Sequence, residues 1–313
     1  MKFDNRFFII VIAAVGLYAI FLIVSDFAIV STQITNFKIQ FLPIIVILVP
    51  CSWLALYARW NLLLRNVNVK ISLKQNLKIY FAGYALAITP GKFGELVKSQ
   101  LLKSKFNVPY TTTAPLVLVE RLYDMVGAVA AAMFGIWLLG IGSVVIIVAS
   151  SVLVLFFVLI SSHNIFNKFL KIFGKFKIMS KILLPISESY EVVRASSRGK
   201  VAFLASLLTL SYWLLESLAV YFVLLAFGID SVTYLNVVST YTTSLILGAA
   251  SFIPGGIGVA EGSLIGLLGL QGMDVSSTLT PVVIIRIVTL WYSVVVGFIA
   301  LKLSGGFSLK AKS

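Results

Sequence analysis

The sequence has little charge and few of the side chains that build metal or redox sites. Only 12% of its 313 residues are charged, whereas a soluble domain carries about a quarter. It has one cysteine, Cys51, and one histidine, His163. A single cysteine cannot form an intramolecular disulfide, and one residue of each kind cannot build a zinc site or a Cys–His catalytic pair. These scarcities exclude a soluble enzyme, a disordered chain and a coiled coil, and we expect neither a metal nor a cofactor.

Long apolar runs make up most of the chain. Hydrophobic residues account for 60% of it, and the mean hydropathy is +1.05. Unbroken runs of about 20 apolar residues fit helices that cross a bilayer and exclude barrel strands, which alternate over about 10 residues. The predicted fold class is an all-α polytopic membrane protein. The six expected crossings are residues 7–24, 41–57, 111–139, 144–160, 201–227 and 278–303. No small-x-small cleavage site follows the first, so we expect an uncleaved helix.

Two further apolar stretches are interrupted before they can cross a bilayer. Residues 79–89 end at Pro90 and reach only about 16 Å, half a bilayer, as a helix. Lys98 follows soon after, so the chain is expected to turn back. Residues 236–253 end at a similar break, and the apolar stretch 262–270 behind it is also too short to cross. The pattern predicts two re-entrant helix pairs, and proline kinks in ordinary spans are the alternative.

The two breaks share the pattern Pro-Gly-x-x-Gly, followed by a glutamate and, in the next span, by an arginine. These residues are Pro90, Gly91, Gly94, Glu95 and Arg121 in the first unit, and Pro254, Gly255, Gly256, Gly258, Glu261 and Arg286 in the second. The proline-to-arginine spacing is 31 residues in one unit and 32 in the other. Proline ends a helix, glycine lets the backbone turn, and a half-helix that starts inside the membrane presents free N–H groups to an anion. Because the units are expected to enter from opposite faces, they predict an inverted repeat, which is common in transporters.

The net charge of +14 is explained by topology. Most lysines and arginines gather in five segments, namely the two termini and residues 59–78, 92–105 and 168–200. Six crossings place all five on one side, which predicts a cell-membrane protein with both termini in the cytoplasm. We expect the loop 161–200 to lie on anionic lipid, and we expect no nucleic-acid binding. The predicted organisation is a single membrane domain with halves 1–160 and 201–303, the basic loop 161–200 and a tail 304–313.

Two arginines lie inside apolar spans. Arg121 and Arg286 each cost about 2.5–3.5 kcal/mol at a helix centre, so each needs a partner or a polar cavity. We predict that both reach a central cavity and hold a lipid phosphate, whose oxygens fit the guanidinium fork. The alternative is that they form internal ion pairs of purely structural importance. The carboxylates expected to hold them when the site is empty are Glu95, Glu120, Asp124 and Glu261.

Four segments together suggest a family. Residues 89–95, 120–124, 254–262 and 286–291 resemble, in this order, the membrane domain of lysylphosphatidylglycerol synthases, a flippase-like family. The resemblance implies that this region moves a phospholipid across the bilayer and that motif residues, Thr289 among them, bind it. In two-domain members a separate soluble domain makes the aminoacylated lipid. This sequence contains no such domain, so we do not expect aminoacyl transfer.

The leading hypothesis is a translocase for a lipid with an anionic or zwitterionic headgroup, including a polyprenyl-phosphate carrier. One alternative is a membrane-embedded transferase acting on lipid phosphate, but no nucleophile–base pair is visible and we do not expect an enzyme. A second is a non-catalytic partner of a glycosyltransferase or lipid synthase. A third is a carrier of small ions or drugs.

The topology can be tested by labelling. Single cysteines at Ser162 and Ser231, in a Cys51→Ala background, should react with a membrane-impermeant maleimide from opposite sides, because the predicted crossings separate them. Labelling of both from the same side would contradict the six-span arrangement and the inverted repeat.

Overall fold

The computed structural model describes residues 33–139, 151, 168 and 190–306. Every regular element in this part of the chain is helical, which confirms the all-α class. Two expected crossings, 7–24 and 144–160, lie outside the described residues, as do most of the basic loop 161–200 and the end of the tail. The count of six crossings therefore stays a prediction.

The described elements fall on either side of residues 140–189, most of which lie outside the described part of the chain. They are η1 (Ile39–Phe41), α3 (Leu42–Asn66), α4 (Leu73–Tyr84), η2 (Pro90–Leu96), α5 (Val97–Phe106), α6 (Tyr110–Leu139), α10 (Tyr190–Ser196), α11 (Gly199–Ala226), α12 (Tyr234–Ala250), η3 (Pro254–Gly256), α13 (Val259–Gly269), α14 (Val275–Arg286), η4 (Ile287–Trp291) and α15 (Tyr292–Leu303). The segments η1 to η3 are 3₁₀ turns and η4 is a π-helix.

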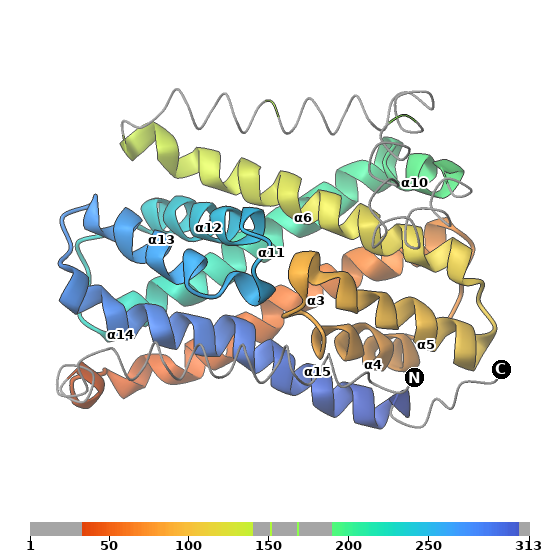
Figure 1. The fold of residues 1–313 in the computed structure, drawn as a ribbon, viewed down its shortest axis with the longest axis horizontal. Helices are drawn as coiled ribbons and strands as arrows, with labels where there is room; N and C mark the ends of the chain where they lie inside the picture. Colours follow the sequence, from red (N-terminus) through yellow and green to blue (C-terminus); the bar gives the residue numbers. More distant parts are fainter. Residues whose placement is uncertain (1–32, 140–150, 152–167, 169–189, 307–313) are drawn as a thin grey trace.

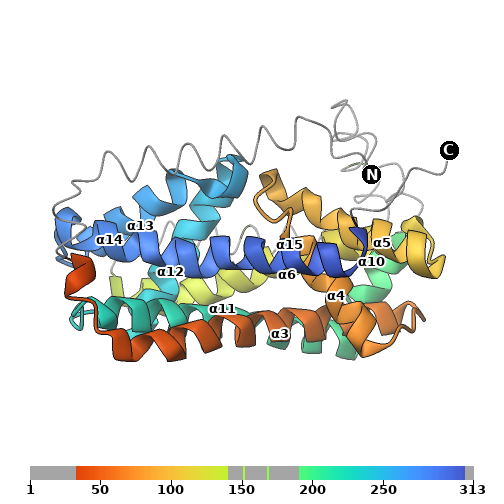
Figure 2. The same cartoon turned by 90° about the horizontal axis from the view of Figure 1, so that it is seen from below.

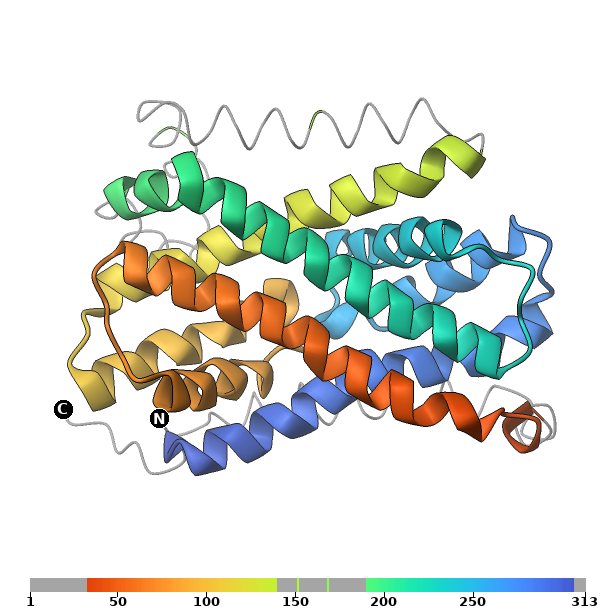
Figure 3. The ribbon, with the colours of Figure 1, turned by 180° about the vertical axis from the view of Figure 1, so that it is seen from behind.

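Long helices run the length of the molecule. Three stretches are long and apolar enough to cross a membrane, namely Ile39–Asn66, Gly199–Ala226 and Val275–Leu303. The last is one continuous rod made of α14, η4 and α15. Helix α6, with 30 residues, matches the expected crossing 111–139 to within one residue. Helices α3 and α11 lie side by side, as Figure 3 shows from behind.

Helix α3 is longer than the sequence predicts. The expected crossing stopped at residue 57 because Arg59 was assigned to a basic loop. In the structure the helix continues to Asn66, and Arg59 is fully buried inside the bundle. The helix continues because carboxylates of α6 compensate the charge of Arg59, as described below.

Two helical hairpins fill the space between the long helices. Helices α4 and α5 form one hairpin, and α12 and α13 form the other. Figure 1 shows that they enter from opposite ends of the molecule and that their breaks, η2 and η3, face each other at its centre. Figure 2 shows α5 and α13 at opposite ends of the same layer.

The first hairpin differs from its predicted bounds. Helix α4 covers Leu73–Tyr84, not 79–89. Residues 85–89 form tight turns in which N–H groups such as that of Ala85 bond to the carbonyl three residues earlier. Thr89 then takes an extended conformation with ψ 148°, because a residue that precedes proline is excluded from the helical region.

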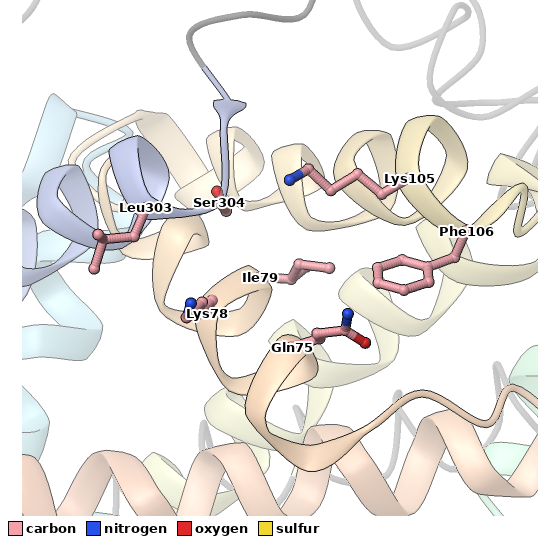
Figure 4. A pocket seen from close by; sticks show the side chains of 7 residues that line it. All are labelled: Gln75, Lys78, Ile79, Lys105, Phe106, Leu303 and Ser304. Atoms are coloured by element: carbon pink, nitrogen blue, oxygen red, sulfur yellow. The ribbon is translucent and has the colours of Figure 1, made fainter.

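The base of this hairpin is basic. Lys78 of α4 and Lys105 of α5 line a pocket of about 200 Å³, together with Leu303 at the end of α15 and Ser304 just beyond it. Figure 4 shows the two lysines on different helices around the opening. The opposite end of the molecule carries Asp230 and Asp274, both exposed.

Helix α15 approaches the first hairpin closely at a glycine. A Cβ at Gly297 would overlap the backbone of Tyr84 and Ala85 and lie 2.8 Å from the Ala85 Cα. By contrast, Gly266 on α13 is exposed, and no described atom would lie within 4 Å of its Cβ.

Gly297→Ala should therefore lower the melting temperature of the detergent-solubilised protein by about 5 °C, because overpacking costs about 1–3 kcal/mol. The matched Gly266→Ala should be neutral or slightly stabilising, because alanine favours helices. Thermal unfolding followed by size-exclusion chromatography measures both. Equal melting temperatures for the two variants would show that the α4–α15 contact is not tight.

Candidate functional site

The first break is a strained turn built around glycine. Gly91 and Lys92 both adopt left-handed conformations, with φ of 60° and 56°. Such a conformation is uncommon for a residue other than glycine. Gly94 donates its N–H to the Thr89 hydroxyl at 2.8 Å. A Cβ at Gly94 would lie 2.6 Å from the carbonyl oxygen of Leu86, so this position has no room for a side chain.

Below this turn, six charged side chains form a closed ring of alternating sign, here called the charge ring. Its members are Arg59 of α3, Glu95 of η2, Lys98 of α5, and Glu120, Arg121 and Asp124 of α6. Its contacts are Arg59–Glu120 at 3.6 Å, Glu120–Lys98 at 2.7 Å, Lys98–Glu95 at 2.9 Å, Glu95–Arg121 at 3.2 Å, Arg121–Asp124 at 2.9 Å and Asp124–Arg59 at 2.7 Å. Each charge touches two of opposite sign, and the three cations balance the three carboxylates.

Two members of the ring correct the sequence analysis. Arg59 and Lys98 were assigned to cytoplasmic basic segments, but both side chains are fully buried. Lys98 lies 4.7 Å from the centre of the Trp60 ring and 4.8 Å from that of Tyr80, and such faces attract cations. Arg59 also donates to the Thr209 hydroxyl at 2.7 Å, which ties α11 to the ring. The spacing of Lys98 three residues after Glu95 was the one sequence signal for this pairing.

The second break carries a simpler arrangement. The Glu261 carboxylate accepts from the Gly258 N–H at 2.7 Å and from the Arg286 Nε at 2.7 Å. The Arg286 guanidinium also donates to the Gly255 carbonyl. The sequence analysis expected free N–H groups at the start of this half-helix. In the structure the Gly258 N–H is not free, because it donates to the Glu261 carboxylate. A carboxylate in the first turn of a helix is attracted to the N–H groups at the start of that helix.

Glycines are required at the second break as well. Gly255, Gly256 and Gly258 all have positive φ, between 64° and 85°. A Cβ at Gly256 would lie 3.0 Å from the Gly248 Cα, so η3 packs directly onto the backbone of α12. At Gly258 no described atom would lie within 4 Å of a Cβ, so only the backbone conformation requires glycine there.

The two breaks meet through apolar side chains. Ile88, Ile257 and Val283 form a small buried cluster, with Trp291 packed against it. A Cβ at Gly255 would lie 3.0 Å from the Ile88 Cγ1. This cluster, here called the tip plug, joins the two breaks, because Ile88 lies just before η2 and Ile257 just after η3.

Arg286 lies immediately before the π-helix η4, a feature that the sequence did not predict. A π-helix inserts an extra residue into a helical turn and often marks a functional site. Thr289, within η4, donates to the Ile285 carbonyl at 2.7 Å and lies beside the Tyr241 hydroxyl.

The structure brings the predicted site residues together in two separate sets. Arg121 contacts Glu95 and Asp124, and Arg286 contacts Glu261. Each arginine thus pairs with the glutamate of its own hairpin. Glu120 contacts Lys98 and Arg59 instead of Arg121.

In the described part of the chain, Lys92 and Glu216 remain as interior charges after these pairs are formed. Lys92, half-buried at the tip of the first hairpin, makes no ion pair with any described residue. Glu216 of α11 is 3% exposed and likewise pairs with no described cation. The sequence analysis counted Lys92 only as a loop charge, and in the sequence Glu216 stands alone with no charged neighbour. Within the described residues no group of histidine, cysteine, aspartate or glutamate is placed to hold a metal ion.

Comparison with known proteins places the chain among membrane proteins of one family. The profile of the lysylphosphatidylglycerol synthase TM region matches residues 10–297. A UPF0104 membrane protein of Methanocaldococcus jannaschii is 27% identical over 219 residues, which cover 68% of this chain and 91% of the relative. A UPF0104 membrane protein of Pyrococcus horikoshii is 25% identical over 287 residues, or 83% of this chain and 85% of the relative. A third, from Methanothermobacter thermautotrophicus, is 23% identical over 278 residues, or 80% of this chain and 82% of the relative.

Breaking the ring should destabilise the protein. Lys98→Met leaves Glu95 and Glu120 without their shared cation, at an expected cost of about 3–5 kcal/mol. The double variant Lys98→Met/Glu120→Gln removes one charge of each sign and should recover part of that loss. Lys103→Met, an exposed position on the same helix, is the matched control. Thermal unfolding in detergent measures all three, and a Lys98→Met variant as stable as the control would show that the ring is not structural.

Proposed function

Because the chain belongs to the lysylphosphatidylglycerol synthase transmembrane family, we propose that it moves a lipid with an anionic or zwitterionic headgroup across the membrane. The headgroup passes between the tips of the two hairpins, and the acyl or prenyl chains stay in the bilayer. No covalent chemistry is part of this proposal.

The proposed orientation places the two hairpins as re-entrant pairs of an inverted repeat. Their entry from opposite ends of the molecule supports it (Figure 1), as does the pairing of each span arginine with its own hairpin glutamate. The end that carries Lys78 and Lys105 is the cytoplasmic one in this proposal, because basic residues are retained on that side.

The proposed function rests on the position of Lys92, which is half-buried at the hairpin tip and has no ion pair among the described residues. The charge ring is internally balanced, and so is the Glu261–Arg286 pair. Lys92 therefore adds a positive charge that has no ion pair among the described residues, at the tip where the hairpins meet. An intramembrane cation without a partner is costly, so it is typical of a substrate pathway. A phosphate supplies the negative charge that Lys92 lacks as an ion-pair partner.

The arginines act after the headgroup has reached Lys92. Arg121 is 17% exposed at its side chain, whereas Arg286 is nearly enclosed and bonds to both Glu261 and Gly255. In the proposed cycle the phosphate displaces a carboxylate from an arginine. A carboxylate freed from Arg121 keeps a second cation of the ring, and Glu261 freed from Arg286 keeps the Gly258 N–H. The tip plug separates as the headgroup passes. Carboxylates nearby prevent the phosphate from being held too tightly to leave.

Lys92→Gln should reduce transport about tenfold or more, because a hydrogen bond to a charged group contributes about 1.5–3 kcal/mol. Lys92→Arg should retain most of the activity, since it keeps the charge. The assay uses vesicles of phosphatidylcholine and phosphatidylglycerol with a fluorescent phosphatidylglycerol, whose outer-leaflet pool is bleached by dithionite.

Lys103→Gln serves as the control, because it removes an exposed lysine ten residues or so along the same hairpin. Wild-type rates in Lys92→Gln would contradict the role of Lys92. Wild-type vesicles that move lipid no faster than empty ones would contradict the proposed function itself.

A further inference from the structure

Glu216 is a buried carboxylate that the proposed lipid pathway does not use. It lies well inside α11 (Gly199–Ala226), one of the helices that can cross a membrane. One of its oxygens, Oε2, accepts from the Tyr212 hydroxyl at 2.7 Å and from the Tyr241 hydroxyl at 3.2 Å. No other hydrogen bond reaches this carboxylate from the described residues, so Oε1 is left available for a proton.

The surroundings of Glu216 contain no free cation in contact with it. The charged and titratable groups on α11 and on the helices that contact it include Tyr212 on α11, Arg59 on α3, Glu120, Arg121 and Asp124 on α6, Tyr241 on α12 and Arg286 on α14, and Lys92 of η2 acts on Glu216 electrostatically. The arginines among them are compensated by carboxylates at 2.7–3.2 Å. Two cations act electrostatically on Glu216, namely Lys92 and Arg286. Arg286 is paired with Glu261 at 2.7 Å, whereas Lys92 makes no ion pair with a described residue.

An isolated carboxylate inside a membrane is costly when ionised, and it avoids that cost by binding a proton. Two tyrosine hydroxyls stabilise the ionised form, and so does the charge of Lys92. Neither the tyrosine hydroxyls nor the charge of Lys92 holds Glu216 in its ionised form as firmly as a direct ion pair would. Glu216 is thus placed to change its protonation state when the charge near Lys92 changes.

We propose that Glu216 is a proton-binding site, and that a proton at Glu216 and a lipid phosphate at Lys92 bind with positive cooperativity. The second half of this statement rests on the proposed function. A phosphate on Lys92 cancels the positive charge that favours ionised Glu216, so the carboxylate takes up a proton from water. By reciprocity, the proton strengthens phosphate binding. Lipid movement is then accompanied by proton movement, which a transmembrane proton gradient can drive.

The protonation of Glu216 can be observed directly by infrared spectroscopy. The purified protein in phosphatidylcholine nanodiscs should show a pH-dependent band of a buried carboxylic acid that Glu216→Gln abolishes. Tyr212→Phe keeps the carboxyl group but removes a hydrogen bond, so it should shift the band. Asp230→Asn, at an exposed position, should leave the band unchanged. A difference spectrum that Glu216→Gln and Tyr212→Phe both leave unchanged would overturn the proton site.

The cooperativity is tested by repeating the titration with phosphatidylglycerol in the nanodiscs. The midpoint of the Glu216 band should rise by about one pH unit, which is about a tenfold change in proton affinity. Lys92→Gln should raise the midpoint in phosphatidylcholine alone and abolish the further response to phosphatidylglycerol. An equal lipid response in wild type and Lys92→Gln would overturn the cooperativity. Failure of the vesicle assay with an intact Glu216 band would count against the proposed function and not against the proton site.

Discussion

The charge ring is the interaction on which the first half of the molecule depends. Without it, six charges would be buried in an apolar bundle, and each would cost several kcal/mol. Closed into a ring, each charge has two partners, so no single contact has to compensate it alone. The ring joins α3, η2, α5 and α6, and through Thr209 also α11. It therefore fixes the tip of the first hairpin relative to three long helices.

The second hairpin is attached more simply. Within the described residues its tip is held by a single buried pair, Glu261 with Arg286, and by close backbone packing of Gly256 on α12. The two hairpins thus share a motif but differ in how firmly their tips are anchored. Where the two tips meet, the described residues form the small tip plug of Ile88, Ile257 and Val283. A path for a headgroup that opens at this plug requires fewer polar contacts to break on the side of the second hairpin.

Sequence reasoning located the elements and the two breaks but not the partners of the charges. The lengths of the apolar runs predicted the ends of α6, of α11 and of the last span (α14, η4 and α15) to within three residues. They could do so because a helix that crosses a bilayer needs mainly sufficient apolar length. Arg59 and Lys98 were misplaced because a basic residue near a helix end is ordinarily a loop charge. Their burial depends on carboxylates of α6 that are distant in sequence. The pairing of Arg121 with Glu95 was anticipated, since both belong to one repeated unit, but the ring that contains them was not.

The π-helix between α14 and α15 sets the rotational phase of the last span. Each helical residue turns the chain by about 100°, so one residue more or fewer rotates everything beyond it by that angle. Arg286 before the π-helix faces Glu261, while Gly297 beyond it faces the backbone of α4. Both contacts exist only for one length of the intervening segment. The extra residue of η4 therefore sets the rotational register of the span. With that register, Arg286 faces Glu261, and Gly297, about a dozen residues later, faces the backbone of α4.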